Sequence, residues 1–117
     1  MITLVCPVNR RPGLTPAEYH RHWREVHARL IAGTPSLARH LVGYTQYPAA
    51  PESYRDGREP PWDGVAIARY ADRAAMDALF AEPDYRRLLQ PDEEYLSDPA
   101  AVRWSTDSRK ALPGLKW

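Results

Sequence analysis

The sequence predicts an α+β fold in which helices cover one face of a four-stranded antiparallel β-sheet. Segments with the period-two alternation of strands and segments with the 3.6-residue period of helices follow one another in the order βαββαβ. Prolines and glycines fall between these segments, which indicates defined turns rather than disorder. Because 117 residues suffice for one domain of typical size and not for two, we expect a single domain.

The first part of the chain predicts a strand and a long helix. Residues 2–8 alternate apolar side chains onto one face, as a half-buried strand does. The helix begins after Thr15, with proline at the first helical position and Glu18 three residues on, which is the pattern of a capping box. Gly33 and Pro35 are expected to end this helix.

Two further strands are predicted over residues 37–47 and 62–70, where successive side chains alternate between two faces. The connection between them, residues 48–61, is rich in proline and long for a hairpin in so small a domain. We therefore expect this connection to be either a flexible loop or a lid over a site.

The last part of the sequence adds a helix and a strand. Asp72 caps a helix that runs to about Glu82, and a short helical piece follows around Tyr85. Residues 91–99 are expected to form a turn region before the final strand, residues 101–106. This is the order of a ferredoxin-like sheet, whose second face carries no helices and needs a partner, most simply a second copy of the chain.

Composition excludes several classes of protein. A net charge of +1 is too balanced for a protein that binds nucleic acid or a membrane surface by charge. The single cysteine, Cys6, has no second cysteine with which to form an internal disulfide. The N-terminal stretch lacks the order of charged and apolar residues of a signal peptide, and we expect a cytoplasmic protein.

Three histidines lie close together in the first predicted helix. At about 100° per residue, His20 and His27 fall on its apolar side and His22 on its polar side. His20 and His22 point ~200° apart, and His20 and His27 are ~10 Å apart along the axis, so neither pair shares a metal ion and no metal site is predicted. A histidine in a half-apolar cleft suits proton transfer near neutral pH. The alternative is a histidine at the edge of the core, hydrogen-bonded to backbone.

Three predicted strands carry one further candidate each, namely Tyr44, Asp63 and Trp104. Gln46 shares the face of Tyr44, which makes that face unusually polar. If Asp63 meets His27 it would orient the imidazole ring, and otherwise it would cap a turn. The acidic residues Asp92, Glu93 and Asp98 are interpreted as helix caps and solvated turn residues.

Several motifs together indicate one family. The stretch RPGLTPAEYH at residues 11–20 is followed by WREVH at 23–27. Further similar pieces are GYTQ at 43–46, WDGVA at 62–66 and the stretch over 92–98. With these motifs, residues 1–106 resemble the EthD-like family of the dimeric α/β-barrel superfamily, which leaves residues 107–117 as a C-terminal tail.

The resemblance implies a homodimer in which two four-stranded sheets pack face to face, with a pocket between each subunit's own helices and sheet. His27 matches the family histidine that faces this pocket, and Tyr44, Gln46 and Asp63 match positions that could line it. Relatives are associated with ether degradation and with aromatic polyketide pathways, where cofactor-free dehydratases, cyclases, decarboxylases and monooxygenases occur.

These observations favour a cofactor-independent lyase or cyclase acting on an aromatic or polyketide-like carbonyl compound. We expect His27 to abstract a proton next to the carbonyl, Tyr44 to hydrogen-bond the enolate oxygen and Asp63 to orient the imidazole. Further substrate contacts are expected from His20, Trp23, Gln46, Trp62 and Trp104. The alternatives are a non-catalytic dimer that binds a hydrophobic metabolite or haem, and a cofactor-free oxygenase of electron-rich phenols.

Overall fold

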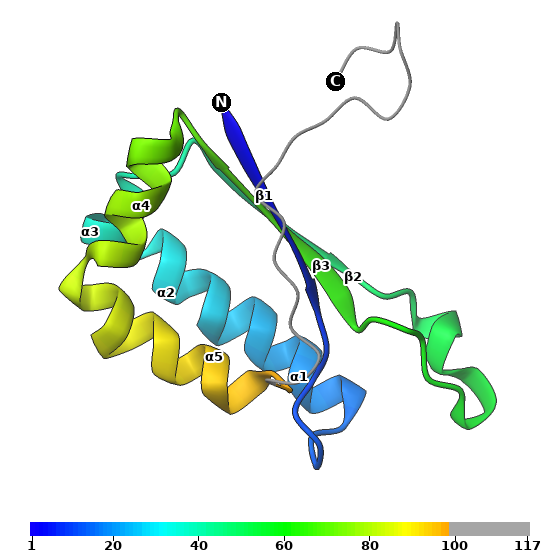
Figure 1. The fold of residues 1–117 in the computed structure, drawn as a ribbon. Coiled ribbons are helices and arrows are strands. Elements are labelled where there is room, and N and C mark those ends of the chain that lie inside the picture. The colour runs from blue at the N-terminus through cyan, green and yellow to red at the C-terminus, as the bar shows by residue number, and fades with distance from the viewer. Residues whose placement is uncertain (99–117) are drawn as a thin grey trace, which may run out of the picture.

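The computed structural model describes residues 1–98, which form an antiparallel sheet with helices on one face (Figure 1). The sheet consists of β1 (Ile2–Val8), β2 (Gly43–Pro48) and β3 (Gly64–Tyr70), with β3 in the middle. This confirms the α+β class and the antiparallel sheet. The fourth strand predicted over 101–106, together with Trp104 and the tail, lies outside the described residues.

The register of the strands gives the sheet two different faces. Alternation along β1 and β3 turns Leu4, Cys6, Ala66 and Ala68 toward the helices, and all four are buried. Together with apolar side chains from the helices they form the hydrophobic core. On the other face, Ile67 lies in the middle of a cross-strand row, paired with one residue of β1 and one of β2.

The first helical stretch has the start and end that the sequence predicts. α1 (Pro16–His22) begins with both hydrogen bonds of the capping box between Thr15 and Glu18. The stretch continues without a break through η1 (Trp23–His27), a turn of π-helix, into α2 (Ala28–Ala32), and it ends at Gly33. The π turn was not predicted, and it bears directly on the site described below.

The strand predicted over 37–47 is wrong in its first half. Leu37 and Ala38 belong to a short helix, α3 (Pro35–Ala38), residues 39–42 form a turn, and β2 begins only at Gly43. Proline fits the first turn of a helix because it has no N–H to leave unpaired, and Leu37 gains full burial in the core from this turn.

The helix after β3 is capped as expected, but the second helical piece is longer than predicted. α4 (Arg73–Ala81) has Asp72 at its N-cap, where the side chain accepts a hydrogen bond from the backbone N–H of Ala75. η3 (Tyr85–Leu89), a second π turn, leads into α5 (Gln90–Leu96). The turn region predicted over 91–99 is therefore wrong up to Leu96, because Pro91 lies in the first turn of α5, where proline is tolerated.

The long connection between β2 and β3 contains a 3₁₀ helix, η2 (Pro51–Gly57). It extends from the end of the hairpin, away from α4 and α5 (Figure 1). No helix in the described part of the chain is long and apolar enough to cross a membrane.

Candidate functional site

A cavity of about 640 Å³ lies between the helices and the inner face of the sheet. Its floor comes from β1, β2 and β3, and its walls come from α1, η1, α2, α4, η3 and α5. The lining is mostly apolar, and the polar side chains that reach it include His27, Tyr44, Tyr85 and Glu93. This volume and lining are typical of sites that bury a small organic molecule.

The imidazole of His27 lines this cavity and is hydrogen-bonded to a carboxylate. Its Nδ1 lies 2.8 Å from Oδ2 of Asp92, and the histidine is buried. An ionised carboxylate only accepts hydrogen bonds, so Nδ1 carries the proton and donates it. The lone pair of the neutral ring is then on Nε2, which has no hydrogen-bond partner among residues 1–98.

The same carboxylate holds a second histidine. Nε2 of His22 donates to Oδ1 of Asp92 at 2.6 Å. In an α-helix, residues five apart point about 140° away from each other. The π turn replaces this spacing by an i to i+5 repeat, which brings His22 and His27 to the same side of the helix, facing Asp92. The expectation that His22 lies apart on the polar side is therefore wrong.

The two imidazoles hold the pKa of Asp92 below its usual value. Burial alone would raise this pKa, but the hydrogen bonds from His27 and His22 outweigh burial. Asp92 is thus ionised at neutral pH and places a negative charge beside the inner histidine.

Tyr44 and Gln46 share one face of β2, as predicted, and they contact each other. The amide nitrogen of Gln46 donates to the hydroxyl of Tyr44 at 3.1 Å and to the backbone carbonyl of Trp23 at 3.0 Å. Trp23 is the first residue of the π turn, so Gln46 links the sheet to the element that carries His27. Burial raises the pKa of Tyr44 to about 12, so its hydroxyl keeps a proton that it can donate to a ligand.

Glu93 is the second acidic residue that α5 brings to the site. Burial raises the pKa of its carboxyl group, and the hydroxyl of Tyr85 donates to its Oε2 at 3.0 Å. The neighbouring positions 92 and 93 therefore have opposite shifts, because Asp92 is held by two histidines and Glu93 faces the apolar cavity.

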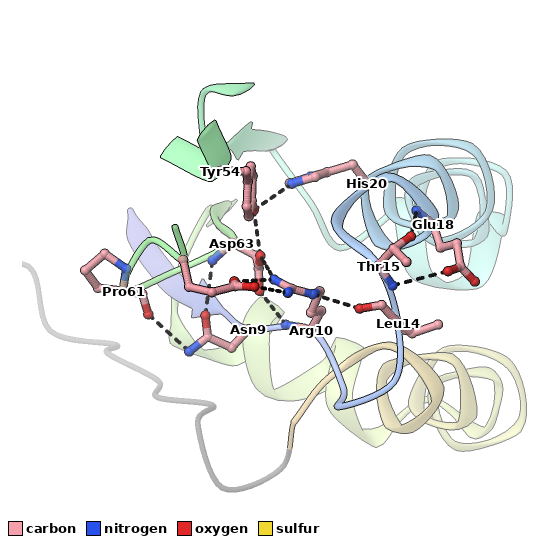
Figure 2. A network of polar contacts seen from close by, with 10 residues as sticks. Asn9, Arg10, Leu14, Thr15, Glu18, His20, Tyr54, Pro61 and Asp63 are labelled. Carbon is pink, nitrogen blue, oxygen red and sulfur yellow. Dashed lines mark hydrogen bonds and ion pairs between the residues drawn. The ribbon is translucent and has the colours of Figure 1, made fainter. Parts of the chain in front are cut away.

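Asp63 does not meet His27, which corrects the predicted pair. It is buried, and its Oδ1 accepts from the guanidinium of Arg10 at 2.7 Å and from the hydroxyl of Tyr54 at 2.6 Å. Tyr54 in turn accepts from Nε2 of His20 (Figure 2). This network fastens η2 to α1, to the segment that follows β1 and to the residue that precedes β3.

His20 likewise lies outside the cavity lining. Burial lowers its pKa, so the ring is neutral, and its Nδ1 is buried without a hydrogen-bond partner in the described part of the chain. We assign His20 and Asp63 to the support of the hairpin loop, and no lining residue comes from the 48–61 connection. The structure thus gives no support to a lid over this cavity.

The three tryptophans that are expected to contact the substrate differ in their positions relative to the cavity. Trp23 is buried and lines the cavity, in part because Gly64 of β3 leaves room for its ring where a Cβ would lie 2.8 Å from it. Trp62 is 38% exposed and does not line the cavity. Trp104 is outside the described residues.

Asp92 and Glu93 are the residues that the sequence interpretation missed. The sequence pattern predicts caps or solvated turn residues at both positions, because Pro91 is typical of the start of a turn. One signal points the other way: Leu89 and Leu96 are two helical turns apart, and both are buried on the same side of a helix that runs through Pro91.

No group of three or more histidine, cysteine, aspartate or glutamate side chains in residues 1–98 is arranged to hold a metal ion.

Solved structures share this fold over nearly the whole chain. An ethyl tert-butyl ether D (EthD) family protein from Bacillus halodurans is 12% identical, with a TM-score of 0.65, over 94% of this chain and 100% of that one. HapK from Hahella chejuensis is 15% identical, with a TM-score of 0.63, over 100% of both chains. A candidate antibiotic biosynthesis monooxygenase from Bacteroides thetaiotaomicron is 17% identical, with a TM-score of 0.58, over 99% of this chain and 94% of that one.

No curated protein matches the sequence. The family model described as the EthD domain matches residues 11–100, which span most of the chain and include the WREVH motif, His27 and Asp92. The resemblance inferred from the motifs is confirmed, and the chain belongs to the EthD domain family.

Proposed function

We propose that this protein binds a flat, largely apolar carbonyl compound in the cavity and moves a proton at the carbon next to the carbonyl, as a lyase or cyclase that uses its own side chains. The observation that carries the proposal is the hydrogen bond between His27 and Asp92 at the wall of an apolar cavity. It leaves one imidazole nitrogen with a lone pair beside a space of substrate size.

His27 would act as the general base in this reaction. Its Nε2 takes the proton from carbon, and the electron pair of the broken C–H bond moves to the carbonyl oxygen to form an enolate. Asp92 stabilises the imidazolium that results, because it is ionised and hydrogen-bonded to Nδ1. Such a base contributes roughly 10²- to 10⁴-fold to a rate.

Tyr44 would stabilise the enolate. Its hydroxyl accepts from Gln46 and keeps its own proton, which can be donated to the oxygen on which negative charge develops. Trp23 and the aliphatic lining would hold the ring system of the substrate and keep water away from the enolate.

The proposal is tested by hydrogen exchange at carbon. Benzylacetone, a methyl ketone with a phenyl group and no other reactive group, is incubated in heavy water with wild-type protein, His27→Gln and His40→Gln, and deuterium uptake is followed by proton NMR. His40 is hydrogen-bonded to Glu82, lies outside the cavity lining, and serves as the matched control. We expect exchange with wild type and His40→Gln, and a loss of about 10²-fold or more with His27→Gln. Equal rates for all three would contradict the proposal, and binding without exchange would assign the cavity to storage or transport of a hydrophobic compound.

A cofactor-free oxygenase is the second candidate, favoured by the name of the similar protein from Bacteroides thetaiotaomicron. Enolate or phenolate formation by His27 would be its first step as well, and the oxygen requirement separates the two functions. Consumption of dissolved oxygen on addition of a hydroquinone would favour the oxygenase, since dehydration and cyclisation consume none.

A further inference from the structure

We propose that Glu93 is a second catalytic group in the cavity, an acid that protonates a leaving hydroxyl group, and that the substrate class is therefore β-hydroxy carbonyl compounds that lose water. The inference rests on the proposed function of His27 and adds to it the identity of the bond that breaks. It starts from a carboxyl group that the proton abstraction by His27 leaves unused.

The position of Glu93 suits an acid that acts inside the cavity. It follows Asp92 on α5, so one turn of helix supplies both the carboxylate behind the base and a carboxyl group in the lining. The Tyr85 hydroxyl fixes Oε2, at 3.0 Å. The bond from Tyr85 engages Oε2 and leaves Oε1 without a hydrogen-bond partner among residues 1–98.

The groups that face Glu93 place it opposite the sheet. Burial is the main cause of the raised pKa values of Cys6, Tyr44 and Tyr70, and the charge of an ionised Glu93 adds to each of them. These three residues come from β1, β2 and β3, so Glu93 lies within electrostatic reach of all three strands. His27 faces it from η1.

Glu93 is suited to hold a proton before the reaction. Burial is the largest influence and favours the neutral acid, and the neighbouring charges of Asp92 and Glu94 act in the same direction. The positive form of His27 and the hydrogen bond from Tyr85 oppose them but do not reverse the shift. The raised pKa favours the protonated form of Glu93, in the same cavity that His27 lines, and elimination needs an acid and a base together.

The reaction balances as a loss of water. His27 takes the proton from the carbon next to the carbonyl, and an enolate forms. The electron pair of the enolate then makes the carbon–carbon double bond while the carbon–oxygen bond to the β-hydroxyl breaks. That oxygen leaves with the proton of Glu93 as water. After water has formed, His27 is an imidazolium and Glu93 is a carboxylate. Transfer of a proton from His27 to Glu93 through solvent returns both groups to their starting states.

The test separates the two proton transfers with two probes. The aldol adduct of benzaldehyde and acetone carries a β-hydroxyl, and its loss of water to benzalacetone is followed by ultraviolet absorption. Benzylacetone lacks the hydroxyl and reports only on exchange by His27. Both are given to wild type, Glu93→Gln, which can still accept from Tyr85, and Glu52→Gln, an exposed control in η2.

We expect Glu93→Gln to lose about 10²-fold in dehydration of the adduct, far more than it loses in the exchange of benzylacetone, and Glu52→Gln to match wild type in both. The circular dichroism spectrum of Glu93→Gln, compared with that of wild type, shows that the variant is folded. Dehydration at the wild-type rate by Glu93→Gln would overturn the role of Glu93, as would a wild type that exchanges the ketone without dehydrating the adduct. A wild type that does neither contradicts the proposed function itself.

Discussion

Asp92 is the residue on which the arrangement of the site depends most. It accepts hydrogen bonds from His22 on the outer side and His27 on the inner side, and it fixes the tautomer of both rings. A buried carboxylate without such partners would be costly, and here the hydrogen bonds from the two imidazoles offset that cost.

The lowered pKa of Asp92 predicts how the stability of the fold depends on pH. The pKa of Asp92 is lower in the folded protein than the ordinary value of 3.8, so its hydrogen bonds stabilise the fold fully above that value. The contribution is lost as the pH falls below 3.8 toward the folded pKa. We expect Asp92→Asn to unfold at a lower temperature than wild type at pH near 7, and the difference to shrink in acid.

Thermal unfolding followed by circular dichroism between neutral pH and about pH 3 measures this difference. The exposed residue Asp77 provides the matched control, since Asp77→Asn should follow the wild-type curve. A gap between wild type and Asp92→Asn that stays constant down to acid pH would show that the charge of Asp92 does not stabilise the fold.

At the scale of single residues, the sequence predicts the histidine and the tyrosine that line the cavity but not the carboxylate beside the histidine. His27 stands out because it lies among apolar neighbours in a helix with a clear start. Asp92 could not be paired with it from spacing, since the contact joins two helices whose packing is set by the whole fold. Asp63 was the better candidate by position at a strand start, but Arg10 and Tyr54 hold it elsewhere.

At the scale of elements, the two π turns decide which side chains meet. η1 turns His22 and His27 toward α5, and η3 comes just before the proline of α5. The sequences of both turns are typical of an ordinary α-helix, because a π turn changes the hydrogen-bond pattern without requiring a special residue. The elements themselves were largely predictable from capping residues and periodicity. The errors fell at 37–42, predicted as strand, and at 91–96, predicted as turn, and in both regions a proline lies in the first turn of a helix.

A substitution in η2 distinguishes residues that stabilise the loop from residues that act in catalysis. Tyr54→Phe leaves His20 without its partner and removes one of the hydrogen bonds to buried Asp63. We expect the free energy of unfolding to fall by about 1–3 kcal/mol, measured by urea denaturation, with ketone exchange unchanged. Tyr47→Phe, which removes an exposed hydroxyl, is the control. A Tyr54→Phe variant that keeps its stability but loses exchange would show instead that the loop acts on the site.

At the scale of the whole molecule, the sheet face opposite the cavity is proposed to join two subunits. Its middle row consists of Val5, Ile67 and Thr45, paired across three strands, and no helix of residues 1–98 covers that face (Figure 1). Because this face is not covered by helices, the sequence predicts a homodimer. A row of β-branched side chains at the centre of a sheet suits a self-complementary interface.

Ile67→Lys tests the dimer. A charge in the centre of the proposed interface would be buried without a partner, so we expect light scattering to give the mass of a dimer for wild type and of a monomer for the variant. Arg69→Lys, at the end of the same strand, keeps its charge and should remain a dimer. A wild type that is a monomer at all concentrations would contradict the face-to-face arrangement.

Nitrogen NMR of protein labelled at histidine, assigned with His27→Gln, reports directly which nitrogen of His27 carries the proton. We expect a proton on Nδ1 and none on Nε2 in the free protein, with the Nε2 signal shifting when benzylacetone is added. A proton on Nε2, or an Nε2 signal that does not respond to the ketone, would contradict the assignment of this ring as the base of the cavity.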